Sequence, residues 1–255
     1  MIANYHTHTN YCDHAKGSPE DCVQAAIEAG ISELGFSEHI PYIFPDGHES
    51  HFRMKRADIK AYVDDVKALK VKYADRIKIY LGLEVEYYPT YFDATLDFIK
   101  DLGIEYIILG QHFIDEQERI HVLSPNNREE HLAAHTKLVC EGMRTGLFTY
   151  LCHPDVVKFD GDIETYKKYA RIICETAKEC NIPLEFNLLG YSTGRSYPKK
   201  EFFEVAAEVG NDVILGVDAH SPERFSEADF EASAVKLLNS LGITPKEKIT
   251  LIKPF

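Results

Sequence analysis

The residues with the clearest chemical potential are histidines that stand at the ends of short apolar segments. His6 and His8 form a His-x-His pair directly after one such segment. Residues two apart in an extended strand point to the same face, so both imidazoles can project side by side. Two imidazoles on a rigid strand end are a typical beginning of a transition-metal site, although a lone His-x-His is equally compatible with two surface histidines.

The same arrangement recurs along the chain. Seven of the twelve histidines fall at or just beyond an expected strand end, one strand ends in Glu84 instead, and Asp218 shares a face with His220 two residues later. Because one ion uses four to six ligands, this set predicts two or three divalent ions that share carboxylates. A combination of imidazole and carboxylate ligands suits Zn, Mn or Fe. The nine candidate ligands are His6, His8, His14, His39, Glu84, His112, His153, Asp218 and His220.

Two of these ligands have a neighbour that competes for the same position. His14 follows Asp13 directly, and His39 follows Glu38, which alternation places on the opposite face of the strand. The remaining histidines and two cysteines close to ligands are interpreted as surface or packing residues: His48, His51, His121, His131, His135, Cys12 and Cys152.

Short β-rich segments alternate with longer amphipathic ones, which is the pattern of a parallel sheet with helices outside. Strands are expected over Ile2–His6, Glu33–Ser37, Ile77–Val85, Tyr106–Gly110, Thr149–Cys152, Pro183–Asn187 and Val213–Val217. A first helix is expected to begin after the cap residue Ser18, and further helices over about Arg56–Tyr73, Thr90–Leu102, Arg128–Thr145, Ile163–Cys180, Lys199–Val209 and Glu227–Leu241.

This alternation predicts seven βα units, which a doubly wound open sheet or a barrel could contain. The first βα turn lacks the Gly-rich phosphate loop expected in the open sheet. A barrel also explains why polar residues gather at the ends of so many strands, because βα barrels assemble their sites at the C-terminal rim. We therefore expect a seven-stranded βα barrel with the metal site on that rim.

Composition limits the classes of protein that need to be considered. The 255 residues carry a net charge of −13 and no linker, which predicts a single domain over residues 1–255 and disfavours partners such as nucleic acid or anionic lipid. No stretch reaches the roughly 20 apolar residues of a membrane span, and no signal peptide is evident. Six scattered cysteines are typical of reduced thiols, so we expect a cytoplasmic protein.

The order of the ligands is similar to that of the polymerase-and-histidinol-phosphatase (PHP) superfamily of metal hydrolases. The resemblance runs from His6 to His220, and the closing Asp218-Ala219-His220 is specific to that family. It implies a distorted (β/α)7 barrel, similar to a TIM barrel, with a trinuclear site in which Glu84 bridges ions and the other eight candidates are ligands. Amidohydrolase barrels also begin with His-x-His, but they finish with a lone aspartate and lack the glutamate of the third strand.

Several stretches resemble the histidinol-phosphate phosphatases within this family. They are residues 11–15, 36–41, 52–54, 82–87, 185–187, 194–195 and 197–198. This resemblance implies hydrolysis of a small phosphate monoester, L-histidinol phosphate, to L-histidinol and phosphate in histidine biosynthesis. We expect a metal-bridging hydroxide to attack phosphorus directly, with Glu84 and Asp218 holding the ions and either Asp155 or His220 protonating the leaving group.

Residues beyond the ligand set are candidates for binding the substrate. Arg195 could hold phosphate oxygens with both guanidinium nitrogens, and Lys158 is a second cation near the rim; each could also be an ordinary surface residue. The long loop 41–55, which includes Arg53, is a candidate lid or a hydrophobic flap packed on the barrel. The imidazole and amine could be recognised by Glu38, Glu86 or Asn187, and Glu86 could equally lie behind the ligands.

Three other functions remain open at this point. A phosphotyrosine phosphatase or a phosphodiesterase could use the same barrel, and a metal-stabilised regulatory domain without turnover could keep the ligands. An exonuclease is disfavoured by the negative charge and the absence of a basic groove. The oligomeric state is left open.

Overall fold

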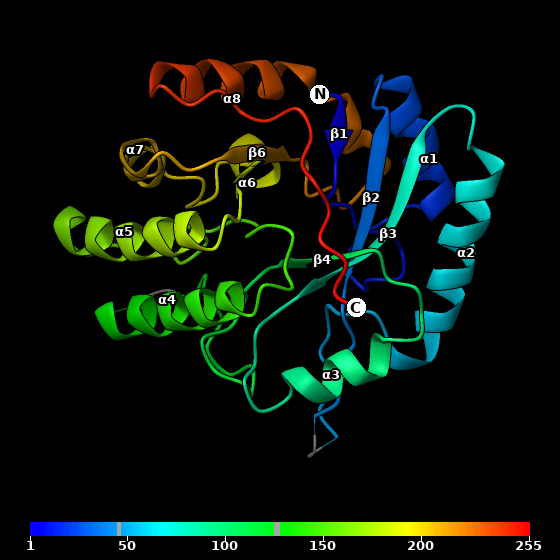
Figure 1. The fold of residues 1–255 in the computed structure, drawn as a ribbon, viewed down its shortest axis with the longest axis horizontal. Coiled ribbons are helices and arrows are strands. Elements are labelled where there is room, and N and C mark those ends of the chain that lie inside the picture. Colours follow the sequence, from blue (N-terminus) through cyan, green and yellow to red (C-terminus); the bar gives the residue numbers. More distant parts are fainter. Residues whose placement is uncertain (45–46, 125–127) are drawn as a thin grey trace.

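The computed structural model describes residues 1–44, 47–124 and 128–255 and shows the expected parallel strands surrounded by helices (Figure 1). The strands β1 (Ala3–Asn4), β2 (Glu33–His39), β3 (Lys78–Val85) and β4 (Tyr106–Leu109) form one parallel sheet in this order. The strands β5 (Leu184–Asn187) and β6 (Val213–Gly216) form a separate parallel pair. The register pairs His39 with Glu84, so these two strand ends meet at one rim.

The strand expected over Thr149–Cys152 is present only as an isolated bridge at Leu151, which pairs with β4 on one side and β5 on the other. Its backbone is nevertheless bonded on both sides: the N–H of Thr149 donates to Ile107 at 2.8 Å, and the N–H of Leu151 donates to Pro183 at 3.1 Å. This short segment joins the four-stranded sheet to the two-stranded pair. The expectation of a regular strand was wrong because the segment supports only one bridge to each neighbour.

The barrel closes between the ends of the chain's first and last strands. Thr7 forms a parallel bridge with Ala219, and the N–H of His8 donates to the carbonyl of Ala219 at 2.8 Å. The N–H of Ala219 donates in return to the carbonyl of His6 at 3.2 Å. Closure therefore brings the His-x-His pair beside Asp218, and the distorted (β/α)7 barrel is confirmed.

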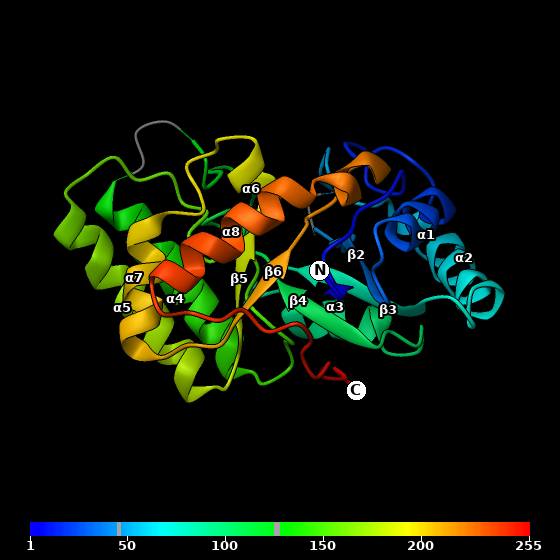
Figure 2. The ribbon, with the colours of Figure 1, turned by 90° about the horizontal axis from the view of Figure 1, so that it is seen from above.

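Helices surround the strands on the outside. In both views, α1 and α2 lie on one side of the strands and α4, α5 and α7 on the opposite side (Figures 1 and 2). The helices are α1 (Pro19–Glu28), α2 (Ile59–Lys72), α3 (Phe92–Ile99), α4 (Glu129–Arg144), α5 (Ile163–Glu179), α6 (Leu188–Ser192), α7 (Lys200–Val209) and α8 (Ala228–Ser240), with 3-10 turns η1 (Arg56–Asp58) and η2 (Pro222–Ser226). The sequence did not predict α6.

Local chemistry explains where the helices begin and end. The hydroxyl of Ser18 accepts the N–H of Asp21, and the carboxylate of Asp21 accepts the N–H of Ser18, so the capping box expected for α1 is confirmed. Gly210 ends α7 with a φ of 77°, a left-handed angle that costs glycine no steric strain. Within the described residues, no helix is long and apolar enough to cross a membrane.

Two apolar clusters hold the barrel together. The larger one packs the helices on the outside of the strands. The smaller one consists of alternate strand residues that point inward, including Tyr5, Tyr106 and Tyr150, and it fills the barrel interior. The hydroxyl of Tyr106 donates to the carbonyls of Tyr5 and Phe36 at 2.8 and 2.9 Å, so this buried polar group is satisfied.

Candidate metal centre

Glu84, near the end of β3, lies at the centre of the histidine cluster. The residue is fully buried, and its Oε2 lies 3.0 Å from Nδ1 of His39 and 3.3 Å from Nε2 of His8. Its Oε1 lies 3.0 Å from Nε2 of His153 and 3.5 Å from Nε2 of His112. One carboxylate therefore faces imidazoles from four strand ends, which is the arrangement expected of a ligand shared between ions.

Asp218 brings a second carboxylate to the cluster, just beyond β6. Its Oδ1 lies 3.4 Å from Nε2 of His6 and 3.5 Å from Nε2 of His8. The same oxygen lies 3.3 Å from Nδ1 of His220. Because Nε2 of His6 also lies 3.4 Å from Glu84, this imidazole faces both carboxylates at once.

Two histidines at the mouth indicate that a cation fits between them. His14 directs Nδ1 to the carbonyl of Phe52, and His220 directs Nδ1 to the carbonyl of Asp218, both at 3.0 Å. Asp13, the alternative to His14, instead lies 3.8 Å from Nζ of Lys55. A carbonyl only accepts hydrogen bonds, so each Nδ1 carries the proton and each Nε2 of a neutral ring keeps its lone pair. These two Nε2 atoms lie 2.8 Å apart, and two lone pairs at this distance repel one another unless they share a proton or a metal ion.

Buried nitrogen atoms elsewhere in the cluster lead to the same conclusion. Within the described part of the chain, Nε2 of His8 and Nδ1 of His39 are buried without a hydrogen-bond partner, which is costly in the absence of a ligand. The residues present therefore fit divalent ions. Ligand atoms lie within 4.8 Å of one another in five groups: His6, Glu84, Cys152 and His153; His8, His39 and His220; His6, His8 and Asp218; His8, Cys12 and Glu38; and His39, Glu84 and His112.

The protonation of the cluster is coupled to its charges. Burial acts to raise the pKa of Glu84, but the facing His39 and His112 hold it well below its usual range. Burial also acts to lower the pKa of His8, and the facing carboxylates of Asp218 and Glu84 raise it to about 9. Metal ions bind deprotonated imidazole, so we expect ions and protons to compete for this cluster.

A buried carboxylate to which the sequence analysis gave no role supports the ligands from behind. Glu185 in β5 accepts from Nδ1 of His6 at 2.8 Å and from the backbone N–H of His153 at 2.9 Å. Asn187 donates to Glu185 at 2.9 Å and to Asp218 at 3.0 Å, and its Oδ1 caps α6. The Asn187 amide thus positions two carboxylates, and its contact with substrate stays a prediction.

Glu38 lies behind His8, on the face of β2 opposite to His39. It is buried, accepts the N–H of Thr9 at 2.7 Å and the thiol of Cys12 at 2.5 Å, and lies 3.8 Å from Nδ1 of His8. The alternation along β2 therefore directs His39 to the cluster and Glu38 away from it. These contacts place Glu38 behind His8, and its recognition of the substrate's imidazole or amine stays a prediction.

Two of the candidate ligands have strained backbones. His153 has a φ of 29° and Asp218 a φ of 51°, in the left-handed region that residues other than glycine rarely adopt. Such conformations cost roughly 1–3 kcal/mol each and persist only where the surroundings hold them. Their occurrence at two positions of one cluster is typical of a functional site.

Comparison with known proteins identifies the family. The pattern that defines the PHP domain matches residues 4–188, which is more than half of the chain. A probable histidinol-phosphatase of Deinococcus radiodurans is 30% identical over 253 residues, which covers 94% of each chain. The chain belongs to the PHP family.

Two further relatives agree with this assignment. A probable histidinol-phosphatase of Schizosaccharomyces pombe is 24% identical over 257 residues, covering 88% of this chain and 82% of the relative. Among solved structures, the histidinol phosphate phosphatase of Lactococcus lactis, in complex with zinc, L-histidinol and phosphate, matches with a TM-score of 0.77 and 19% identity. That match covers 99% of this chain and 97% of the other, so the two proteins share the PHP fold.

Arg195 contacts Tyr197, and its place in the phosphate site stays a prediction. It is exposed, and its Nη1 donates to the hydroxyl of Tyr197 at 2.8 Å. The ring of Tyr197 is buried and lies 6.0 Å from the imidazole of His153. Arg195 is thus linked to the surroundings of His153 through Tyr197. Lys158 is half-buried, and its backbone N–H donates to the carbonyl of Val122. Its contact with phosphate stays a prediction.

Arg53 and Glu86 are placed differently from the expected substrate contacts. Both are buried, and Nη1 of Arg53 donates to Oε2 of Glu86 at 2.6 Å. The other oxygen of Glu86 faces Nδ1 of His112 at 2.8 Å, so Glu86 lies behind a ligand. In the predicted lid, residues 45 and 46 lie outside the described residues, and Tyr42 and Phe44 are buried against the barrel.

Asp155 lies behind the rim, not among the ligands. Its Oδ2 accepts the backbone N–H of Lys199 at 2.5 Å, and the residue lines a small cavity with His135 and Tyr166. Burial raises the pKa of Asp155 to about 7. Of the two candidates for protonating the leaving group, the structure thus places His220 in the cluster and Asp155 outside it.

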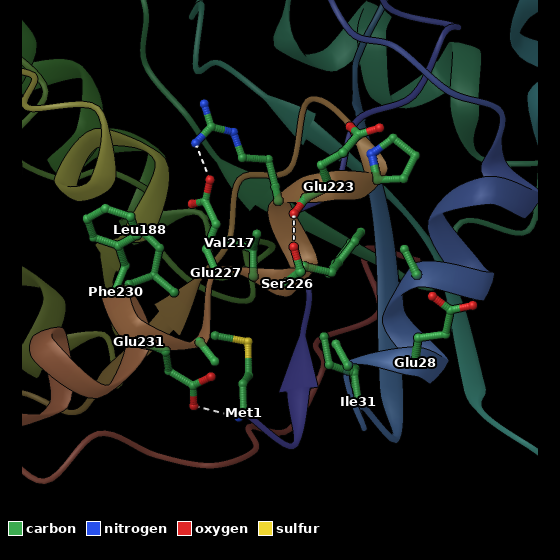
Figure 3. A pocket seen from close by; sticks show the side chains of 16 residues that line it. Met1, Glu28, Ile31, Leu188, Val217, Glu223, Ser226, Glu227, Phe230 and Glu231 are labelled. Atoms are coloured by element: carbon green, nitrogen blue, oxygen red, sulfur yellow. Dashed lines mark hydrogen bonds and ion pairs between the residues drawn. The ribbon is translucent and has the colours of Figure 1, made fainter.

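A separate cavity of about 470 Å³ lies between α1, η2 and the start of α8 (Figure 3). It is lined by apolar side chains such as Leu188 and Phe230 together with several acids. The polar groups pair with one another: the ammonium group of Met1 lies 2.5 Å from Glu231, and Arg224 lies 2.7 Å from Glu227. Nothing in this cavity resembles the ligand cluster.

Proposed function

We propose that this PHP protein is a metal-dependent phosphomonoesterase that hydrolyses L-histidinol phosphate to L-histidinol and phosphate. The single observation that carries the chemistry is the buried cluster in which Glu84 faces five imidazoles. The substrate is supported by the full-length relative named a probable histidinol-phosphatase and by the Lactococcus lactis structure that contains histidinol and phosphate.

The proposed cofactors are two or three divalent ions, Zn, Mn or Fe, held by the nine candidate ligands. Bound ions would supply the Lewis acidity that polarises a phosphoryl group and activates water near neutral pH. The protein's part is to hold Glu84 and Asp218 as shared carboxylates and to orient the imidazoles through Glu185, Glu38 and Glu86.

The chain's own cations complete the phosphate site in this proposal. Arg195 binds phosphate oxygens from the mouth of the site, where its guanidinium group is exposed. Arg195 donates a hydrogen bond to Tyr197, whose ring lies beside the imidazole of His153. The proposed location is the cytoplasm, where unpaired cysteines such as these six are usual. The proposed pathway is histidine biosynthesis.

A substrate comparison on one sample tests the proposal. We expect kcat/KM for L-histidinol phosphate to exceed that for p-nitrophenyl phosphate, phosphotyrosine and a phosphodiester by several orders of magnitude, with two or three ions per chain. A different ranking at full metal content would replace the substrate and keep the hydrolase. Turnover that persists without metal would overturn the proposal.

A further inference from the structure

The segment Ser50–Met54 reaches the ligand cluster from the outside. Met54 forms an antiparallel bridge with Cys12, and its N–H donates to the carbonyl of His39 at 3.3 Å. The backbone of the segment is therefore fixed to two chain segments that carry candidate ligands.

Phe52 contacts three of these ligands. Its carbonyl accepts from Nδ1 of His14 at 3.0 Å, which leaves the Nε2 of His14 as the atom available to an ion. Its ring lies edge-on to His39 at 4.9 Å and 5.8 Å from the ring of His112. Phe52 thus limits how these rings can rotate.

Arg53 is the next residue, and it reaches His112 through Glu86. Its Nη1 lies 2.6 Å from Oε2 of Glu86, whose Oε1 lies 2.8 Å from Nδ1 of His112. The guanidinium group is buried over the rings of Phe52 and Tyr42, at 4.6 and 4.9 Å.

A second carboxylate, Glu118, completes the surroundings of Arg53. It accepts from Nε of Arg53 at 3.0 Å and also from Nη2. Glu118 has a φ of 53°, so its backbone is held in a strained conformation. Removing Arg53 from such a buried set would leave its two carboxylates uncompensated, so Arg53 helps to hold the orientation of Glu86.

We propose that Ser50–Met54 is a positioning clamp for one part of the metal site, the group formed by His39, Glu84 and His112 together with His14. This inference rests on the proposed metal centre and adds to it a dependence on Arg53, which contacts no candidate ligand directly. Groups that orient ligand histidines from behind typically change metal affinity by about 10- to 100-fold.

The clamp reaches only part of the cluster. His6 is oriented by Glu185, which also accepts the backbone N–H of His153. The group of His6, Glu84 and His153 is therefore anchored in β5 and has no contact with Ser50–Met54 among the described residues. Loss of the clamp should weaken one ion and spare the others.

The test is metal titration of the 255-residue chain after Arg53→Lys, which keeps a positive charge but cannot bond both carboxylates in the same way. Metal-free protein is titrated with Zn²⁺ or Mn²⁺, and bound ions are counted after dialysis. We expect one ion to bind about 10- to 100-fold more weakly and the remaining ions to keep their affinity. Excess metal should restore kcat, which it would not do for a misfolded protein.

Glu118→Gln and Phe52→Leu provide second variants if Arg53→Lys does not fold, and each should weaken the same ion. The matched control is Arg171→Lys. Arg171 lies on α5 and forms an exposed ion pair with Glu208 on α7, and this variant should bind all ions as the unmodified chain does. Unchanged affinity for every ion in a folded clamp variant, or equal loss of all ions, would overturn the clamp alone. An unmodified chain that binds no divalent ion would overturn the proposed function as well.

Discussion

The rim cluster and the cavity of Figure 3 are both partly enclosed and rich in charge, yet they differ in how their polar groups are satisfied. In the cavity, Met1 pairs with Glu231 and Arg224 pairs with Glu227. At the rim, Nε2 of His8 and Nδ1 of His39 are buried without a hydrogen-bond partner in the described part of the chain.

This difference indicates which of the two regions is the candidate active site. A concave space is not by itself a site, because its groups can satisfy one another. Buried imidazole lone pairs that face carboxylates are stable only when a cation binds to them. Four predictions, in order of decreasing effect, test whether this distinction holds.

Glu84→Gln should have the largest effect. The amide keeps the shape but removes the charge that two ions would share, so we expect a loss on the order of 10³-fold in kcat/KM and at least one fewer bound ion. Activity on L-histidinol phosphate and metal content check this on one sample. Normal metal content with normal turnover would mean that the rim is not the site.

Arg195→Ala should reduce kcat/KM by roughly 10²-fold while all ions stay bound, because the side chain would contact phosphate and not metal. Steady-state kinetics and metal analysis separate the two effects. Arg171→Ala serves as the control for removing an exposed arginine. Near-normal turnover would remove Arg195 from the site.

His135→Gln tests whether a buried unpartnered nitrogen is sufficient to indicate a metal ligand. Nδ1 of His135 lacks a hydrogen-bond partner among the described residues, and burial, with smaller effects of His153 and His112, lowers its pKa from 6.5 to about 3. The unfolded chain therefore binds the proton between about pH 6.5 and 3, and stability falls as the pH falls through this window by at most about 1.4 kcal/mol per unit.

Chemical denaturation at several pH values measures this slope. We expect His135→Gln to flatten it and to leave metal content unchanged, whereas His131→Gln on the same helix should retain it. Loss of a bound ion in His135→Gln would show that His135 belongs with the rim.

Glu227→Gln should have the smallest effect. Its pair with Arg224 is partly exposed, so we expect the free energy of unfolding to change by at most about 1 kcal/mol and kcat/KM to stay the same. Thermal unfolding and the standard assay are sufficient. A large loss of activity would show that the cavity contributes to function.

Sequence reasoning succeeded where local periodicity and topology act together. Strand alternation placed His39 and Glu38 on opposite faces, and the common rim of parallel strands brought His6, Glu84 and Asp218 into one cluster. These outcomes depend on the period of two and on the direction of the strands, both of which can be read from a sequence.

The features that were missed depend on contacts between distant segments. Glu185 could have been suspected, because it lies two residues before Asn187 on the same face of its strand. Glu118 gave no such signal: it lies in a loop, and only the folded chain brings it to Arg53, 65 residues away. Arg53 itself was expected to face the substrate. Its burial between two carboxylates depends on the position of the loop that carries Glu118, which the sequence does not show.

Two glycines inside the barrel limit which relatives could keep this site. A Cβ on Gly110 would lie 1.8 Å from Oε1 of Glu84, and a Cβ on Gly216 would lie 1.8 Å from Oε1 of Glu185. Any larger residue there would have to expel the carboxylate from the strand beside it. A family member that replaces either glycine while retaining every histidine should therefore be suspected of having lost its activity, even though a comparison of ligands alone would count it as intact.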